Sequence, residues 1–317
     1  MTAPPELKKR ALLVGIGKYD HANDLTTCHN DVAEMNRLLE HHADGRRNYH
    51  CETLSTINQR IDKPMLLEAM RHHFNTETDQ SLLYLTGHGG REIYQSFFMT
   101  QEARPTDEGI PLRSIMKLLQ RAKAQHNIVI VDACYSGDLG RTIDQSNQVQ
   151  LPHNCALLTS TAPLDVARGI GGRGVFSYIL TEGLAGAAAD PSGWVSVAGL
   201  YAQVDRLLSP LQQRPYFRAN LSQMLHLRQC DTLLTDALLR TIVTYFPTPN
   251  ATHACPASWT FPLNRNKASQ EEKDLSALFR SGMIEPDSWS EDQDRIRIHA
   301  FRLTEQGKHY LRVVRKQ

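Results

Sequence analysis

The sequence predicts an α/β protein with a mostly parallel sheet flanked by helices, followed by a small C-terminal α+β domain. Three observations predict this fold class: short apolar runs that are nearly continuous, segments of helical spacing between them, and a change of composition near Gln229. A chain of 317 residues, 41% hydrophobic and 22% charged, has room for about two packed domains. We place the first domain at residues 1–228 and the second at 229–317.

Four apolar runs are the predicted strands of the sheet. They are nearly continuous instead of alternating, which is typical of strands buried on both faces of a parallel sheet. The runs lie at residues 11–16, 82–85, 128–131 and 156–158.

Predicted helices separate these strands, as the βα units of a parallel sheet require. Apolar side chains recur at helical spacing on one face of each of the first three segments. The expected helices cover residues 30–42, 64–74, 110–124, 175–187 and 195–208. Two polar, turn-rich stretches, at residues 137–154 and 162–173, are predicted as long loops, and loops of this length inside a compact domain are usually functional or mobile.

The C-terminal domain has a different pattern. Residues 247–264 hold four prolines and no clear periodicity. A helix over residues 275–284, a strand pair that ends with residues 296–303, and a helix over residues 304–314 are predicted after it. This order resembles the end of a winged-helix module.

Composition excludes several classes of protein. The chain has 35 Lys and Arg against 34 Asp and Glu, a net charge of +1, which argues against binding nucleic acid by bulk charge. No run approaches the ~18 apolar residues of a membrane span, and no signal-peptide core follows the N-terminus. None of the six cysteines forms a CxxC pair, which fits a reduced compartment. We therefore expect a cytoplasmic protein.

Glycine and histidine motifs give no cofactor or metal site. Gly15 and Gly17 lack the third glycine of a dinucleotide fingerprint, and Leu12 stands at the first glycine of a would-be P-loop, so a tight turn is the better interpretation. The histidine pairs at residues 41–42 and 72–73 are adjacent and point apart on a helix, so we expect no metal there.

The strongest signal is a Cys/His pair. His88 follows one predicted strand and Cys134 follows another, each in a loop with glycines. The carboxyl ends of neighbouring parallel strands meet at one edge of a sheet, so His88 and Cys134 are expected to lie together. A thiol needs such a base to act as a nucleophile, and free N–H groups beside Gly89 could stabilise an oxyanion. An inert cysteine at a strand end is the alternative.

These motifs resemble the caspase-like cysteine peptidases of clan CD, nearest to the metacaspase and bacterial caspase branch. The resemblance runs from about residue 11 to 227 and rests on ALLVGIGKY, LTTCHNDVAEM, LLYLTGHGG, IVIVDACYSGD and GVFSYILTEGL. The spacing from His88 to Cys134 is close to the ~50 residues of caspases. Asp132 replaces the Gln of the animal caspase motif, as is typical of the metacaspase-like branch. The resemblance implies Cys134 as nucleophile, His88 as acid/base, and the N–H groups of Gly89 and Cys134 as oxyanion hole.

The resemblance also implies the specificity pocket. In metacaspase-like enzymes two acidic residues line the pocket for the residue before the cut bond, and here these are Asp31 and Asp132. Two carboxylates can grip a guanidinium bidentately, so cleavage after Arg, or Lys, is expected rather than after Asp. Cys28 and Thr86 are then secondary pocket residues. Asp31 as a helix N-terminal charge is the alternative.

Two family features concern activation. Metacaspases often need calcium; Asp107 and Glu108 could contribute ligands, but Arg141 stands where another acidic ligand is expected, so calcium is not favoured. The loop over residues 137–154 matches the place where caspases are cut. Arg141 is the candidate self-cleavage site, with Arg168 and Arg173 as alternatives.

The C-terminal domain is expected to be regulatory. Bacterial caspase-like proteins often belong to antiviral defence systems in which a second domain detects a signal, in some cases a nucleotide second messenger. Candidate residues for stacking and pairing with a nucleotide are Trp259, Trp289, Arg295 and Arg297, although the tryptophans as core of the small domain are the favoured interpretation. DNA binding by the winged helix is the less favoured role, so nucleic acid is an unlikely partner.

The sequence thus predicts a cysteine endopeptidase that cleaves proteins after Arg, or Lys, and is an effector of bacterial antiviral immunity. An unrestrained protease would be toxic, so we expect it to stay inactive until a signalling nucleotide or an upstream sensor protein binds. A catalytically silent scaffold and a winged-helix DNA-binding regulator are the alternatives.

Overall fold

The computed structural model describes residues 8–91, 96–105, 107, 109–134, 151–160, 174–190, 192–208, 215–231, 234–255, 269–292 and 295–315. The chain divides into two compact units. The first is made of Met1–Ala189 and Val195–Cys230, and the second of Asp190–Trp194 and Asp231–Gln317.

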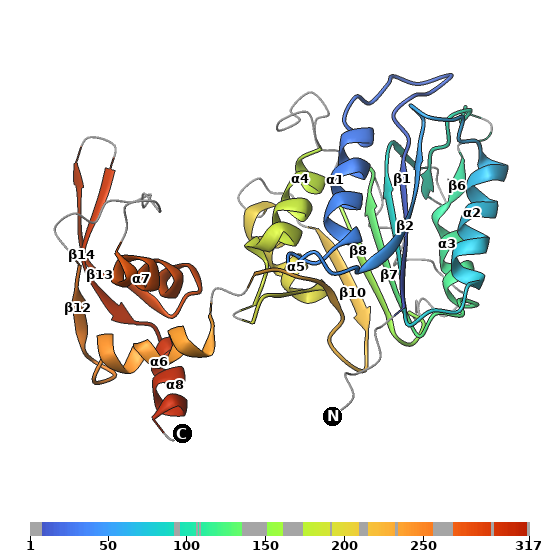
Figure 1. Cartoon of the computed structure of the whole chain (residues 1–317). Helices are drawn as coiled ribbons and strands as arrows, with labels where there is room; N and C mark the ends of the chain where they lie inside the picture. The colour runs from blue at the N-terminus through green and yellow to red at the C-terminus, as the bar shows by residue number, and fades with distance from the viewer. Residues whose placement is uncertain are drawn as a thin grey trace. The chain divides into compact units, whose positions relative to one another are not determined.

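A six-stranded sheet forms the centre of the first unit, in the order β10-β8-β7-β3-β1-β2 (Figure 1). All neighbours are parallel except β10, which runs antiparallel to β8. The strands are β1 (Lys9–Gly15), β2 (Tyr49–Ser55), β3 (Gln80–Thr86), β7 (His126–Asp132), β8 (Cys155–Thr159) and β10 (Tyr216–Asn220). The predicted α/β fold with a mostly parallel sheet is confirmed.

The strands that the sequence predicted are the inner ones, and the two it missed are the edges. β3 is buried along its whole length, so it reads as a continuous apolar run. β2 has exposed and half-buried positions in its middle, and β10 has two exposed ones, so neither shows such a run.

Helices cover both faces of the sheet (Figure 1). Ala11 and Leu13 pack on one face against α1 (Cys28–Glu40), α4 (Val175–Glu182) and α5 (Val197–Leu208). Leu12 and Val14 pack on the other face against α2 (Lys63–Asn75) and α3 (Leu112–Leu119). This alternation along β1 follows from the two-residue period of a strand.

Local signals fix the ends of these helices. Asp62 accepts a hydrogen bond from the Met65 N–H at 3.0 Å and so caps α2, with Pro64 in the first turn. The helix expected over residues 175–187 is α4 followed by a π-helical turn (Gly183–Ala187), and Gly186 leaves helical geometry at φ 132°.

Short strands add two small sheets to the first unit. β4 (Gly89–Arg91), β5 (Ser96–Phe98) and β6 (Ile110–Pro111) form an antiparallel three-stranded sheet directly after the loop that carries His88. β9 (Trp194–Ser196) pairs with β11 (His226–Gln229).

The second unit is a small α+β structure with its own core. Its three-stranded antiparallel sheet has the order β12-β14-β13. The elements are α6 (Asp236–Tyr245), β12 (Thr252–Ala254), α7 (Gln270–Arg280), β13 (Ile284–Asp292), β14 (Arg295–Leu303) and α8 (Glu305–Val314). Ser269 and Glu272 form a capping box that starts α7 five residues before the predicted helix.

One prediction about this unit is wrong. Trp289 was expected in the core, but its side chain on β13 is 58% exposed. The core consists instead of aliphatic and phenylalanine side chains from the helices and sheet, among them Phe246, Leu275 and Phe301. All six cysteines of the chain are free thiols. Within the described residues no helix is both long and apolar enough to span a membrane.

Candidate active site

Two adjacent strands bring His88 and Cys134 to one edge of the sheet. β3 ends at Thr86 and β7 ends at Asp132, and these two residues are partners in the parallel register. The Gly87 N–H donates to the Asp132 carbonyl at 3.2 Å just beyond the strands. The loops that carry His88 and Cys134 therefore start at the same level of the sheet.

Gly89 lies directly against the backbone of Cys134. A Cβ atom on Gly89 would collide with the Cys134 carbonyl, so only glycine allows this approach. The N–H groups of Gly89 and Cys134 both approach the Cys134 sulfur and act to lower its pKa. Burial and the Asp132 charge outweigh them and raise the pKa of the thiol above its ordinary value. The free site thus holds a neutral thiol beside two backbone donors.

Tyr19 and Asn23 orient His88. The Tyr19 hydroxyl accepts the His88 N–H at 2.7 Å and donates to the Ile16 carbonyl at 2.8 Å, and the two rings lie 4.7 Å apart. The Nε2 atom of His88 lies 2.8 Å from the Asn23 carbonyl. A carbonyl only accepts hydrogen bonds, so Nε2 carries the hydrogen and Nδ1 of the neutral ring keeps the lone pair.

Asp31 and Asp132 both lie close to Gly174. Asp31, in the first turn of α1, is fully buried, and both its oxygens accept the Gly174 N–H at 3.2 Å. A Cβ placed on Gly174 would lie 3.3 Å from the Oδ2 atoms of both carboxylates. The two oxygens are therefore at most about twice that distance apart, within the span of one guanidinium group.

A hydrogen-bond chain supports Asp132 from behind. The Ser177 hydroxyl donates to Asp132 Oδ2 at 2.6 Å, and the Tyr84 hydroxyl lies 2.5 Å from the Ser177 oxygen. Burial raises the pKa of Asp132, while hydrogen bonds from Ser177 and Ser160 oppose that rise. A cation placed beside Asp132 would relieve this cost of burying its charge.

Cys28 and Thr86 lie beside the two carboxylates. The Thr86 hydroxyl donates to the Cys28 sulfur at 3.8 Å. Burial, together with the charges of Asp31 and Asp132, raises the pKa of the Cys28 thiol to about 12. Cys28 is therefore a neutral thiol at neutral pH.

The structure gives no side-chain position for most of the other candidate residues. Arg141, Arg168, Arg173 and Trp259 lie outside the described residues. Trp289, Arg295 and Arg297 belong to the β13–β14 hairpin of the second unit, and the two arginine side chains are not described.

No calcium site is built from the candidate residues that the structure describes. Asp107 pairs with Lys63 at 2.6 Å, and Glu108 lies outside the described residues. Among the residues with described positions, no three His, Cys, Asp or Glu side chains come together as metal ligands would.

Sequence reasoning missed the supporting residues. Tyr19, Tyr84, Ser177 and Gly174 were assigned no role, because each acts through a partner far away in sequence. Tyr84 could have been suspected, since a tyrosine inside a buried strand needs a hydrogen-bond partner. Ser177 and Gly174 carry no local signal of this kind.

Comparison with known proteins finds one matching family model and several distant solved structures. The caspase-domain family model matches residues 8–226. A solved protein from Geobacter sulfurreducens is 17% identical, with a TM-score of 0.47, and the match covers 68% of this chain and 94% of that one. Caspase-1 from Spodoptera frugiperda is 15% identical, with a TM-score of 0.49 and coverages of 72% and 93%. The Drosophila initiator caspase Dronc is 11% identical, with a TM-score of 0.49 and coverages of 66% and 78%.

No curated protein matches the chain significantly in sequence. The family model, in contrast, spans the whole six-stranded sheet and both Cys134 and His88. Residues 8–226 thus form a caspase domain, and the chain belongs to the caspase-domain family of cysteine peptidases.

Proposed function

We propose that this protein is a cysteine endopeptidase that cleaves proteins after Arg and, less efficiently, after Lys. The observation that carries the proposal is the pair of carboxylates, Asp31 and Asp132, which both lie close to Gly174, with Asp132 two residues before Cys134. Two acidic groups in one pocket attract a cation, whereas an Asp side chain would be repelled. Arg is preferred to Lys because its planar guanidinium reaches both carboxylates at once.

Cys134 and His88 carry out the chemistry. The Cys134 sulfur gives its proton to Nδ1 of His88 and attacks the carbonyl carbon of the substrate Arg. The N–H groups of Gly89 and Cys134 stabilise the oxyanion of the tetrahedral intermediate. His88 then protonates the leaving amine as the C–N bond breaks and a thioester forms. Water, losing a proton to His88, attacks the thioester and releases the Arg carboxylate and the thiol.

Hydrolysis of fluorogenic peptides ending in Arg, Lys or Asp tests the proposal. Arg peptides should be cleaved fastest, and Cys134→Ala should abolish cleavage. Asp31→Asn and Asp132→Asn should each lower kcat/KM for the Arg peptide by about ten-fold or more, because a charge-assisted hydrogen bond is lost in a desolvated pocket. Preferred cleavage after Asp would overturn the assignment of Asp31 and Asp132 to the pocket, but not the assignment of Cys134 as the nucleophile.

We further propose that the free protein is held inactive until a ligand or partner binds. A peptidase that cleaves after Arg without restraint would damage the proteins of its own cell, and the second unit, with a core of its own, offers a separate body for a signal to bind. The proposed activator is a signalling nucleotide or a sensor protein acting through the second unit, in a role in bacterial antiviral immunity in the cytoplasm. High activity of the purified, ligand-free chain would overturn this regulation.

The activator is sought by adding calcium, or a small-molecule extract from phage-infected cells, to the peptide assay. Stimulation by the extract supports the nucleotide role, and stimulation by calcium alone replaces it with a metal-dependent switch. A chain that binds partners, yet shows no Cys134-dependent hydrolysis under any addition, would be a scaffold instead of an enzyme.

A further inference from the structure

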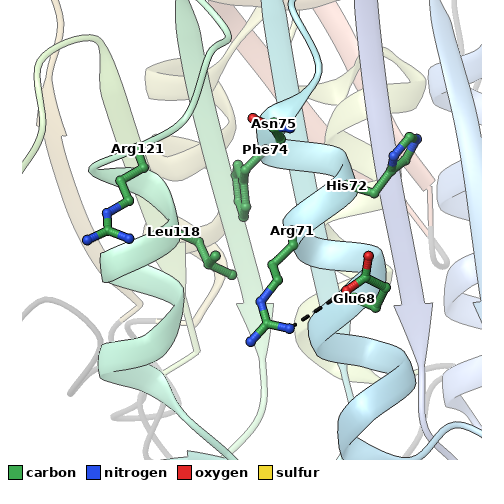
Figure 2. Close-up of a pocket in the computed structure, with 7 residues that line it drawn as sticks. All are labelled: Glu68, Arg71, His72, Phe74, Asn75, Leu118 and Arg121. Carbon is green, nitrogen blue, oxygen red and sulfur yellow. Dashed lines mark ion pairs between the residues drawn. The ribbon is translucent and has the colours of Figure 1, made fainter.

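A groove of about 320 Å³ lies between α2 and α3, on the face of the sheet opposite α1. Phe74 of α2 and Leu118 of α3 point into the space between the two helices, and Arg71 extends from α2 beside them (Figure 2). Phe74 is buried and Leu118 is half-buried, and Arg121, just after α3, also lines the groove. The groove therefore combines an apolar floor with cationic walls.

The cationic character extends along α3. Arg113 and Lys117 are exposed and lie four residues apart on one stripe of α3, and the exposed Arg121 follows two residues after the helix ends at Leu119. Residues 112–124 contain no Asp or Glu. In the part of the chain that the structure describes, none of these three cations forms an ion pair. Such a stripe is unusual in a chain whose net charge is only +1.

The one carboxylate in the groove is weakly held. Glu68 lies 3.7 Å from Arg71, and the two side chains are 75% and 59% exposed. Exposed pairs of this kind contribute only about 0–1 kcal/mol, so a carboxylate from another molecule can compete with Glu68 for Arg71.

The groove lies far from the Cys/His pair along the sheet. Most of its lining residues lie in the second half of α2 or at and just after the end of α3, and α2 ends just before β3 begins. His88 follows the other end of β3, which is seven residues long. At about 3.3 Å per residue, the strand alone separates the two ends of the sheet by roughly 23 Å.

We propose that this groove is an exosite, a second binding site for the protein substrate, which takes an acidic segment that also carries an apolar side chain. Carboxylates of that segment would pair with Arg71 and Arg121, and its apolar side chain would pack on the half-buried Leu118. The role in cleavage rests on the proposed peptidase function, whereas binding of the segment does not.

A peptide fits the groove better than a nucleic acid or a membrane surface. The narrow apolar floor between two helices suits one side chain of a peptide. A phosphate backbone makes many ionic contacts and gains nothing from an aliphatic floor. A lipid surface requires apolar side chains that stand out from a convex face, whereas Leu118 is half-buried between two helices.

Direct binding tests the exosite without any need for catalysis. The full chain carrying Cys134→Ala is titrated into a fluorescein-labelled peptide of alternating Glu and Leu, and anisotropy is followed at low and high salt. Arg71→Gln and Arg121→Gln should each raise Kd by about three-fold, and salt should weaken binding. Glu68→Gln should lower Kd, because it removes the competing carboxylate.

Matched controls decide whether the groove is responsible. Lys273→Gln, which removes an exposed cation from α7 of the second unit, should leave Kd unchanged. The charge reversal Lys117→Glu/Arg121→Glu should raise Kd by at least about ten-fold. Equal binding by all variants overturns the proposal. So does groove-dependent binding of an oligothymidylate or of phosphatidylserine vesicles without binding of the peptide.

Kinetics then link the exosite to cleavage. Substrates carry the acidic segment on either side of the scissile Arg, separated by spacers of about four, eight or twelve residues. Only spacers of about eight residues or more can reach from the groove to Cys134 along the sheet. Only those substrates should therefore have a higher kcat/KM than the short Arg peptide that lacks the acidic segment. Arg121→Glu should remove this gain and leave the short peptide unaffected. If the short Arg peptide itself is not cleaved, the peptidase proposal is refuted. The anisotropy measurements would still show whether the groove binds the acidic segment.

Discussion

At the residue scale, the state of the Cys134 thiol decides how the site works. Burial and the Asp132 charge raise its pKa, so we expect a thiol and not a preformed thiolate at neutral pH. Alkylation of Cys134 by iodoacetamide, followed by peptide mass spectrometry, should be slower at pH 7 than that of a free cysteine peptide and should rise only above the ordinary thiol pKa. Labelling that already saturates below pH 8 would contradict this.

Gly89 offers a second test at this scale. A methyl group there would collide with the Cys134 carbonyl, so Gly89→Ala must displace either β4 or the nucleophile. We expect kcat to fall by about 100-fold or more, in the range seen when an oxyanion donor is lost. Gly45→Ala is the matched control: its φ of 84° is also unfavourable for alanine, but the space around it is open and it lies outside the site. An equal fall of kcat in the two variants would show that the close contact between Gly89 and Cys134 has no special role in catalysis.

At the scale of elements, α2 carries a buried histidine with a thermodynamic consequence. His73 is 1% exposed, and neither ring nitrogen has a hydrogen-bond partner. Burial lowers its pKa from 6.5 to about 4. As the pH falls, His73 is therefore protonated in the unfolded chain before it is protonated in the folded protein. Its contribution to the free energy of unfolding is fully present above pH 6.5 and is lost as the pH drops toward 4, by roughly 2–3 kcal/mol.

Urea unfolding of wild type and His73→Leu at pH 7.5 and 4.5 measures this effect. The variant should be at least as stable at pH 7.5 and should lose less stability on acidification. It should retain part of the decline, because burial also lowers the pKa of His42 to about 4. Identical losses in the two proteins would show that His73 does not titrate in this way.

The elements also show what a single sequence can and cannot predict. β1, β3 and β7 were predictable because burial on both faces makes them continuously apolar, and this placed His88 and Cys134 at one edge. The edge strands β2 and β10 have mixed burial and gave no such signal. Ser177 supports Asp132 from α4, 45 residues away, and only folding reveals such a contact.

At the scale of the whole molecule, the two units have separate cores, and this predicts two unfolding transitions. Trp289 lies on β13 of the second unit, whereas Trp194 begins β9, which pairs with β11 of the first unit. In a Trp194→Phe background, tryptophan fluorescence therefore follows the second unit, while circular dichroism follows both. Phe301→Ala, at a fully buried position, should destabilise only the fluorescence transition, by about 3–5 kcal/mol. A single transition by both probes, shifted as one by Phe301→Ala, would show instead that the units unfold together.

The central claim is that Cys134 attacks a carbonyl whose Arg side chain is held by Asp31 and Asp132. Covalent capture tests it most directly: the protein is treated with peptide chloromethyl ketones ending in Arg or in Asp, with and without the activating extract, and the modified residue is identified by mass spectrometry. The account predicts a Cys134 adduct with the Arg reagent, a much slower reaction with the Asp reagent, and loss of the Arg preference in Asp132→Asn. Faster capture by the Asp reagent, or modification of another cysteine in place of Cys134, would contradict it.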